Sequence, residues 1–177
     1  MPGNERKAMP GIEQYIIRPE PRAEAPGADF AAIPVSPPEQ AGGAFAIVEH
    51  PLGPRVLAAP MHAHTHEDET TYVLSGTIGL RIGEEEAMLG PGCCAFKPRG
   101  IPHTFWNAGD RPARVLEIVS PAGFERYFGE LLPILANKDA SGQPDMGALM
   151  ALAQRYGLRM DLGSIPSLLA RHGLKMA

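Results

Sequence analysis

Short apolar runs separated by glycine and proline fill the chain between residues 44 and 120. Eight such runs occur, and they read AFAIVE, RVLAAPM, TTYVL, TIGLRI, EAMLG, CCAFK, HTFW and ARVLEIVS. Turn-forming residues every few positions over so short a span favour an antiparallel sandwich or barrel. The sequence therefore predicts a mainly β domain over residues 44–120.

The spacing of apolar residues changes after residue 120 and becomes helical. The first apolar stripe follows Pro121, a residue common at helix starts, and comprises Phe124, Tyr127, Phe128, Leu131, Leu132 and Leu135. A second helix is expected over about 145–156, and a third from Ser164 to about His172, where Gly173 ends it. We predict that residues 121–177 form a helical extension packed on the β domain.

The N-terminal part is rich in proline and glycine, above all between residues 19 and 43. Such a composition forbids long regular elements, so residues 1–43 are expected to form an irregular arm. Neither a signal peptide nor an apolar stretch of about 18 residues is evident, which predicts a protein that is neither exported nor membrane-embedded. A second Met-Pro-Gly begins at Met9 and leaves the start of translation open.

Length, charge and cysteine content narrow the possibilities further. At 177 residues the chain is about one domain long. The net charge is −4 and the 16 basic residues are scattered, so no basic stripe is present to bind nucleic acid. Cys93 and Cys94 are adjacent and cannot form a disulfide that links distant segments, which favours a reducing cytoplasm.

Four side chains of the kind that bind metals occur in two short segments. His62, His64 and Glu69 lie in the first segment and His103 in the second. Residues two apart on a strand face the same side, so His62 and His64 can both point into a barrel. Three imidazoles and one carboxylate suit a divalent first-row transition metal better than calcium or magnesium. His66 leaves a second choice open, because it forms another alternating pair with His64.

The same alternation suggests which side chains line a pocket beside this site. Thr71 and Val73 share the face of Glu69, and Phe105 and Asn107 share that of His103. Phe96 is a further candidate for an apolar wall, and Trp106 should point the other way. Adjacent strand residues face opposite sides, so at most one of the two cysteines looks inward. We expect both to take the places of small apolar residues, although a thiolate ligand for copper or zinc is the alternative.

The two segments resemble the signature motifs of the cupin superfamily, Gly-x5-His-x-His-x(3,4)-Glu-x6-Gly and Gly-x5-Pro-x-Gly-x2-His-x3-Asn. The first motif is matched from His62 through Gly76, and the second at Gly92, Pro98, Gly100, His103 and Asn107. The opening glycine of the first motif is replaced by Val56, with Gly53 nearest. The resemblance implies a cupin-type antiparallel β-barrel, also called a jelly roll or double-stranded β-helix. It also implies a homodimer and the metal ligands His62, His64, Glu69 and His103, which is why His62 is preferred to His66.

Within that superfamily, the runs HEDETTYVLSG and FKPRGIPHTFWNAGDRPARVLEIVSPAGFERYF are similar to small bacterial cupins akin to quercetinase-type flavonol dioxygenases. This resemblance implies one divalent transition metal ion per chain, drawn from Fe, Mn, Ni, Cu, Co or Zn. It further implies a dioxygenase-type oxidoreductase that acts with dioxygen on a small aromatic or enolisable compound, with Glu69 taking a proton from the substrate. A metal-dependent isomerase or decarboxylase, or a non-catalytic small-molecule-binding protein, are the alternatives.

Overall fold

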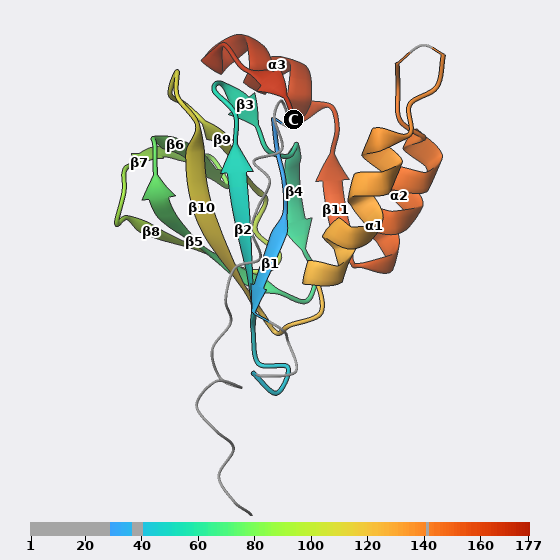
Figure 1. Ribbon diagram of the computed structural model, residues 1–177, viewed down its shortest axis with the longest axis horizontal. Helices are drawn as coiled ribbons and strands as arrows, with labels where there is room; N and C mark the ends of the chain where they lie inside the picture. The colour runs from blue at the N-terminus through green and yellow to red at the C-terminus, as the bar shows by residue number, and fades with distance from the viewer. Residues whose placement is uncertain (1–28, 37–40, 141) are drawn as a thin grey trace, which may run out of the picture.

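Two β-sheets and three helices make up the protein in its computed structural model, which describes residues 29–36, 41–140 and 142–177 (Figure 1). The strands are β1 (Ile33–Ser36), β2 (Ala46–Leu52), β3 (Val56–Leu57), β4 (Met61–His64), β5 (Asp68–Ser75), β6 (Ile78–Ile82), β7 (Glu85–Leu89), β8 (Cys94–Lys97), β9 (His103–Asn107), β10 (Ala113–Ser120), β11 (Leu158–Asp161) and β12 (Lys175–Met176). The helices are α1 (Glu125–Ala136), α2 (Met146–Arg155) and α3 (Ser164–His172).

The strands pair in an order that brings distant parts of the chain together. One sheet runs β1-β2-β10-β5-β8, and the other contains β11-β4-β9-β3-β12 with β6 and β7 joined to it through β9. All of the pairings are antiparallel except that of β12 with β3. Each of the eight apolar runs contributes at least one strand, and the prediction of a mainly β fold with C-terminal helices is confirmed.

Apolar side chains from both sheets meet in the space between them. The main cluster contains Leu52, Val73, Ile78, Leu80, Phe105, Ala113 and Val115. Strand alternation explains this selection, because in β10 every second residue from Ala113 to Val119 is buried. Gly76 allows the chain to turn from β5 into β6: its φ is +84°, and an added Cβ would collide with Ala113.

The C-terminal helices begin and end close to the expected residues. The Asp145 side chain accepts a hydrogen bond from the amide of Ala148 at 3.0 Å and so caps the N-terminus of α2. Helix α3 ends at Gly173, whose φ of +62° is the left-handed cap that glycine adopts without strain. The helices α1 and α2 pack against each other beside β11 (Figure 1).

The segments on either side of the barrel also contribute strands, which differs from the expectations. Residues 121–177 supply β11 and β12 in addition to helices, and they extend the second sheet along β4 and β3. Residues 1–28 and 37–40 of the expected irregular arm lie outside the described residues, but Ile33–Ser36 form β1 on β2. Local sequence patterns do not report such pairings, because the partner strands lie far away in the chain.

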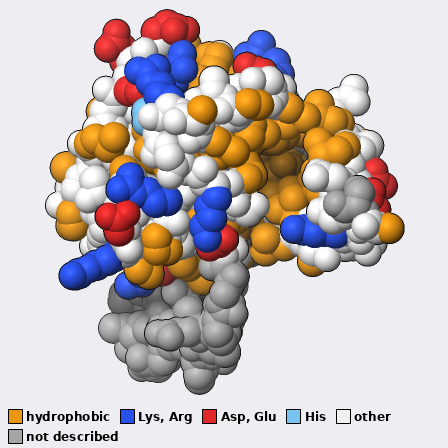
Figure 2. Space-filling model, turned by 90° about the horizontal axis from the view of Figure 1, so that it is seen from above, with side chains coloured by type: hydrophobic (Ala, Val, Ile, Leu, Met, Phe, Trp, Pro, Cys, Tyr) orange, Lys and Arg blue, Asp and Glu red, His pale blue; other side chains and the backbone are white. Residues whose placement is uncertain are grey.

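Hydrophobic side chains also reach the surface. Seen from above, they surround a hollow between the α1–α2 hairpin and the rest of the molecule (Figure 2). Two methionines of α2, Met146 and Met150, are partly exposed. Among the described residues, no helix is long and apolar enough to cross a membrane.

His50 of β2 is buried among aromatic rings close to the barrel interior. Its Nδ1 donates to the carbonyl oxygen of Ala31 at 2.9 Å, and its ring lies 5.0 Å from that of Phe30 and 4.9 Å from that of Phe128. Burial lowers the pKa of His50 from 6.5 to about 4. The folded protein therefore holds this imidazole neutral at pH values at which the unfolded chain protonates it.

We predict that His50 makes the metal-free protein sensitive to acid. Its contribution to stability is complete above about pH 6.5 and is lost as the pH falls towards 4, because the unfolded state binds the extra proton. In His50→Asn the free energy of unfolding should fall less steeply over this window, by up to about 1.4 kcal/mol per pH unit. Urea titrations at several pH values measure the slope, and equal slopes in the two proteins would contradict the prediction.

Candidate metal centre

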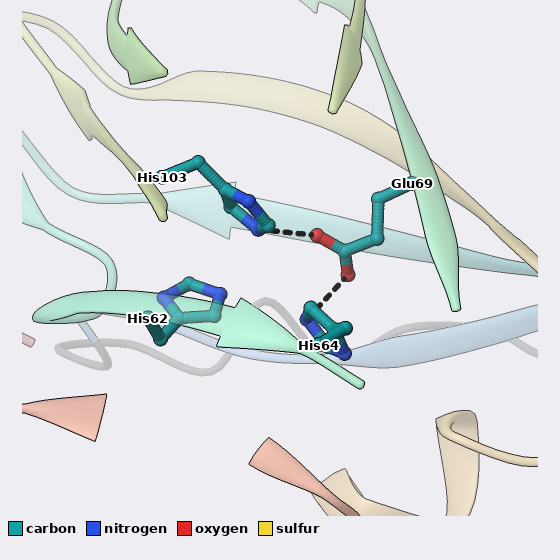
Figure 3. A group of neighbouring side chains, drawn as sticks. All are labelled: His62, His64, Glu69 and His103. Carbon is teal, nitrogen blue, oxygen red and sulfur yellow. Dashed lines mark hydrogen bonds and ion pairs between the residues drawn. The ribbon is translucent and has the colours of Figure 1, made fainter. Parts of the chain in front are cut away.

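Three strands bring four potential metal ligands to one place inside the barrel. His62 and His64 come from β4, Glu69 from the start of β5 and His103 from the start of β9. His62 and His103 are directly opposite each other in the antiparallel β4–β9 pair. One donor atom from each of the four residues lies within 4.8 Å of the others, and their side chains point toward one another (Figure 3).

Backbone carbonyl groups fix the orientation of two of the imidazoles. Nδ1 of His62 donates to the carbonyl oxygen of Pro60 at 2.8 Å, and Nδ1 of His103 donates to that of Ile101 at 3.0 Å. The Nε2 atom of each neutral ring therefore carries a lone pair, which is the form that binds a metal. These hydrogen bonds hold the rings in the tautomer that a metal site requires.

The cluster has the chemistry of a site built for a cation. Nε2 of His103 lies 3.1 Å from Oε2 of Glu69, and Nε2 of His64 lies 3.4 Å from Oε1. Lone pairs on nitrogen and oxygen repel each other at such distances unless a proton or a metal ion lies between them. Nε2 of His64 is buried without a hydrogen-bond partner, a costly arrangement that a metal–nitrogen bond would remove, and Nδ1 on the other side of the ring lies 3.5 Å from Oε2 of Glu67. The four residues thus fit a divalent transition metal ion.

Electrostatics favours the protonation states that metal ligands need. Burial lowers the pKa of His62 well below its ordinary value, and the neighbouring His103 and His64 lower it further. The pKa of His103 is also lowered, chiefly by burial. Burial alone would raise the pKa of Glu69, but the Lys97 ammonium and the neighbouring histidines hold it well below its usual range. Neutral imidazoles and an ionised carboxylate are the forms that bind metals.

A buried ion-pair network adjoins the cluster, and the sequence analysis missed it. Nζ of Lys97 lies 2.9 Å from Oε2 of Glu69 and 2.9 Å from Oε2 of Glu117. The hydroxyl of Thr71 donates to Oε1 of Glu117 at 2.7 Å. Burial works against the charged form of Lys97, but Glu117 and Glu69 outweigh it and raise the pKa of the lysine. A sequence signal existed for Glu117, because it alternates in phase with the apolar Val115 and Val119.

The expected pocket residues divide into two groups. Thr71, Val73 and Phe105 are buried in the barrel as expected. Phe96 is 58% exposed, so its expected place in the pocket is wrong: in β8 it is Lys97 that points inward. Asn107 is buried, but its amide donates to the carbonyls of Leu52, Gly53 and Arg111 and accepts from the amide of Gly109. The side chain of Asn107 thus links two loops. Its donor and acceptor groups are used in these contacts, so they do not face a pocket.

The structure also places the remaining candidates. His66 is exposed beside Gly157 and takes no part in the cluster. Cys93 and Cys94 are free and exposed, so neither replaces a small apolar core residue as expected. Trp106 points away from the barrel interior, into a cluster with Leu57, Met61 and Leu168.

Aromatic side chains of the C-terminal extension cover one side of the cluster. The ring of Phe124, just before α1, meets that of His64 at a centroid distance of 4.3 Å and nearly perpendicular. Phe124 also stacks on Tyr127 at 4.9 Å. The apolar stripe predicted the helix, but only the structure shows that Phe124, the first residue of the stripe, contacts the candidate metal ligand His64.

A cleft of about 710 Å³ opens on the other side of β4 and is lined by Met61 and Ala63 together with Met160 of β11. Because successive strand residues face opposite sides, Met61 and Ala63 point away from the side of His62 and His64. The cleft thus lies outside the barrel and does not include the candidate metal centre.

Residues 51–119 match the cupin domain family Cupin_2. The "Tetracenomycin polyketide synthase protein TcmJ" of Streptomyces glaucescens is 29% identical to this chain over 86 residues. The matched part covers 49% of this chain and 58% of that protein, so the chain spans less than two thirds of the length of this curated relative.

Solved structures are also similar to part of the molecule. KdgF from Halomonas sp. has a TM-score of 0.50 at 17% identity, with 55% of this chain and 84% of that chain covered. The protein TT1209 from Thermus thermophilus is 31% identical, with 62% and 93% covered and a TM-score of 0.48. The family match agrees with the observed sheets and confirms a cupin-type fold. The finer resemblance to quercetinase-type dioxygenases stays a prediction.

We predict that metal binding depends on the four clustered residues and not on His66. His62→Ala or His103→Ala should lower the metal content of the purified protein at least tenfold, because each change removes a nitrogen donor. His66→Ala is the matched control and should retain the wild-type content. Elemental analysis after loading and desalting measures the bound metal. Loss of metal in the control together with retention in His62→Ala would contradict the assignment.

Proposed function

We propose that the protein, whose residues 51–119 form a cupin domain, is a metal-dependent oxidoreductase of the dioxygenase type that acts on a small enolisable or aromatic compound. The observation that carries the proposal is the convergence of His62, His64, Glu69 and His103 on one point inside the barrel.

The donor set leaves room for a substrate. Four protein ligands leave one or two positions free on a five- or six-coordinate ion, so the site is open in the manner of catalytic centres. A bound divalent ion would supply Lewis acidity, which makes an enol or phenol hydroxyl easier to deprotonate. Glu69 is the carboxylate among the four clustered residues, so it is the side chain placed to accept that proton.

The walls around the cluster favour a largely apolar substrate. The ring of Phe124 lies against His64, and Phe105 and Val73 belong to the buried apolar cluster of the barrel. Aromatic and aliphatic walls with a few polar groups are typical of sites for small organic molecules. Phe124 thus gives the cluster an aromatic neighbour on the side of His64, in keeping with an aromatic or enolised compound.

The name of one relative supports an enolisable substrate. TcmJ is described as a polyketide synthase protein. Polyketide chains carry carbonyl groups on alternate carbons, and the C–H bonds between two carbonyls are acidic and enolise readily. A compound of this class offers the oxygen atom that a Lewis-acid site binds and the proton that Glu69 accepts.

The same relative favours a second candidate function, in which dioxygen takes no part. Isomerisation of an enolisable compound begins with removal of a proton beside a carbonyl group. Decarboxylation of a β-keto acid instead releases CO2 and leaves the bonding electrons in an enolate, which is then protonated. The cluster would then act only as Lewis acid and base. Turnover without oxygen separates this function from the first.

We further propose that two copies of the chain form a homodimer through the outer face of the β1-β2-β10-β5-β8 sheet. Tyr72 and Phe96 are 40% and 58% exposed there, next to the partly buried Leu116 and Ile118 on β10. Exposed apolar faces of this kind are typical of interfaces between protein molecules.

The cysteines support a reducing compartment, and we propose the cytoplasm. Cys93 and Cys94 are both free and exposed on or beside β8. Exposed thiols persist in a reducing environment and are oxidised outside it.

We predict oxygen consumption by protein loaded separately with iron, manganese, nickel, copper, cobalt or zinc and supplied with 1,3-diketones or flavonols. Glu69→Gln should lower the rate at least a hundredfold, because it removes the proton acceptor. Glu85→Gln, which changes an exposed carboxylate of β7, is the control and should retain the wild-type rate. An oxygen electrode and product mass spectrometry measure the reaction. Equal turnover in the absence of oxygen would favour the oxygen-independent isomerase or decarboxylase. A metal-loaded protein that binds these compounds without converting them would contradict both enzymatic functions.

We predict that Phe96→Asp converts the dimer to monomers, because it replaces the most exposed apolar side chain of the proposed interface by a charge. Met88→Asp is the matched control, since Met88 is 60% exposed but lies on β7 in the other sheet. Sedimentation velocity measures the mass of each variant. A monomeric wild-type protein, or a dimer that survives in Phe96→Asp, would contradict the proposal.

A further inference from the structure

Lys97 is a buried cation placed directly beside a candidate metal ligand. It lies opposite Glu69 in the register of β5 and β8, and its side chain has no exposure. The ammonium group is 2.9 Å from a carboxylate oxygen of Glu69 and 2.9 Å from one of Glu117. Its remaining side lies over the ring of Phe105, at 5.1 Å from the centroid. The lysine is therefore enclosed by two anions and an aromatic face.

The lysine and the candidate metal site use the same carboxylate. Oε2 of Glu69 contacts both Nζ of Lys97 and Nε2 of His103. In the metal-free protein Lys97 supplies the positive charge that a buried Glu69 needs, since a lone buried carboxylate is strongly destabilising. A metal ion bound by that carboxylate would lie close to the ammonium group and be repelled by it.

Glu117 holds the lysine in this position from the other side. Its Oε2 pairs with Lys97, and its Oε1 accepts the hydroxyl proton of Thr71 at 2.7 Å. The charges of Lys97 and Glu117 cancel each other. Because Lys97 is shared between Glu117 and Glu69, it compensates the negative charge of Glu69 only in part. That charge attracts a metal ion, while Lys97 limits how strongly it does so.

We propose that Lys97 is a positioning residue that holds Glu69 in place when the metal is absent and opposes metal binding when it is present, so that it sets the metal affinity of the site. Glu117 weakens this opposition by sharing the ammonium group. The inference rests on the proposed metal site, but it concerns affinity and makes no use of the reaction.

Replacement of the lysine tests the inference through binding alone. Lys97→Met removes the charge and keeps an unbranched side chain of similar length, and it should raise the affinity for Zn²⁺ or Co²⁺ at least tenfold. Lys97→Arg keeps the charge and should show no such rise. Competition with a chromophoric chelator measures the dissociation constants for the full-length protein. A purely structural role of Lys97 predicts the opposite result, a weaker site in Lys97→Met, because the ligand would lose its support.

Changes at Glu117 should have the opposite sign. Glu117→Gln leaves Lys97 paired with Glu69 alone, so the affinity should fall at least tenfold below that of the wild-type protein. Lys97→Met alone leaves the buried carboxylates of Glu69 and Glu117 both unpaired. The double variant Lys97→Met with Glu117→Gln leaves only that of Glu69, so it replaces the single variant if that protein does not fold. Its affinity should exceed that of Glu117→Gln at least tenfold.

The outcomes distinguish failure of this inference from failure of the proposed function. A wild-type protein that binds none of the metals overturns the metal site and, with it, the role of Lys97. A wild-type protein that binds metal, with no gain in affinity on removing Lys97 from either background, overturns the inference alone. Affinity that rises without Lys97 and falls without Glu117 supports it.

Discussion

Ionised side chains inside a small β-barrel have to be compensated by other groups of the protein, and this constraint shapes the centre of the molecule. Lys97 lies 2.9 Å from a carboxylate oxygen of both Glu69 and Glu117, and all three side chains are almost fully buried. On the other side of Glu69 the partners are imidazoles that burial keeps neutral, as the lowered pKa values of His62 and His103 show. Neutral nitrogen donors beside an ionised carboxylate attract a further cation. The candidate metal site thus lies where the interior compensates Glu69 from one direction only.

Strand register decides which residues meet in this interior, and much of it could be predicted from the sequence. The spacing of His62 and His64 on one strand put both rings on one face, and Glu69 joined them. Lys97 and Phe96 show why the rest was harder. The run CCAFK follows a turn, so its phase is not fixed by alternation alone, and the apolar Phe96 was expected inside although Lys97 is the buried residue. Only the pairing of β8 with β5 determines that phase.

Contacts between distant segments account for the other differences. Asn107 has the alternation of a pocket residue, but its amide is used by carbonyl groups of two loops. Strands β11 and β12 carry little local signal, because they are short and depend on β4 and β3 for their hydrogen bonds. The helices were easier to predict, since caps such as Asp145 and Gly173 act within a few residues of the chain.

The family match includes the four candidate ligands but not the aromatic ring that covers one of them. All four candidate ligands lie within residues 51–119, the part that matches the cupin domain. The ring that covers His64 belongs to Phe124, and β11 supports β4 from outside that range. Relatives can therefore share the ligands of this protein and differ in the wall that a substrate meets. The surroundings of the candidate ligands therefore depend on residues 121–177 as well as on the barrel, because Phe124 contacts His64 directly.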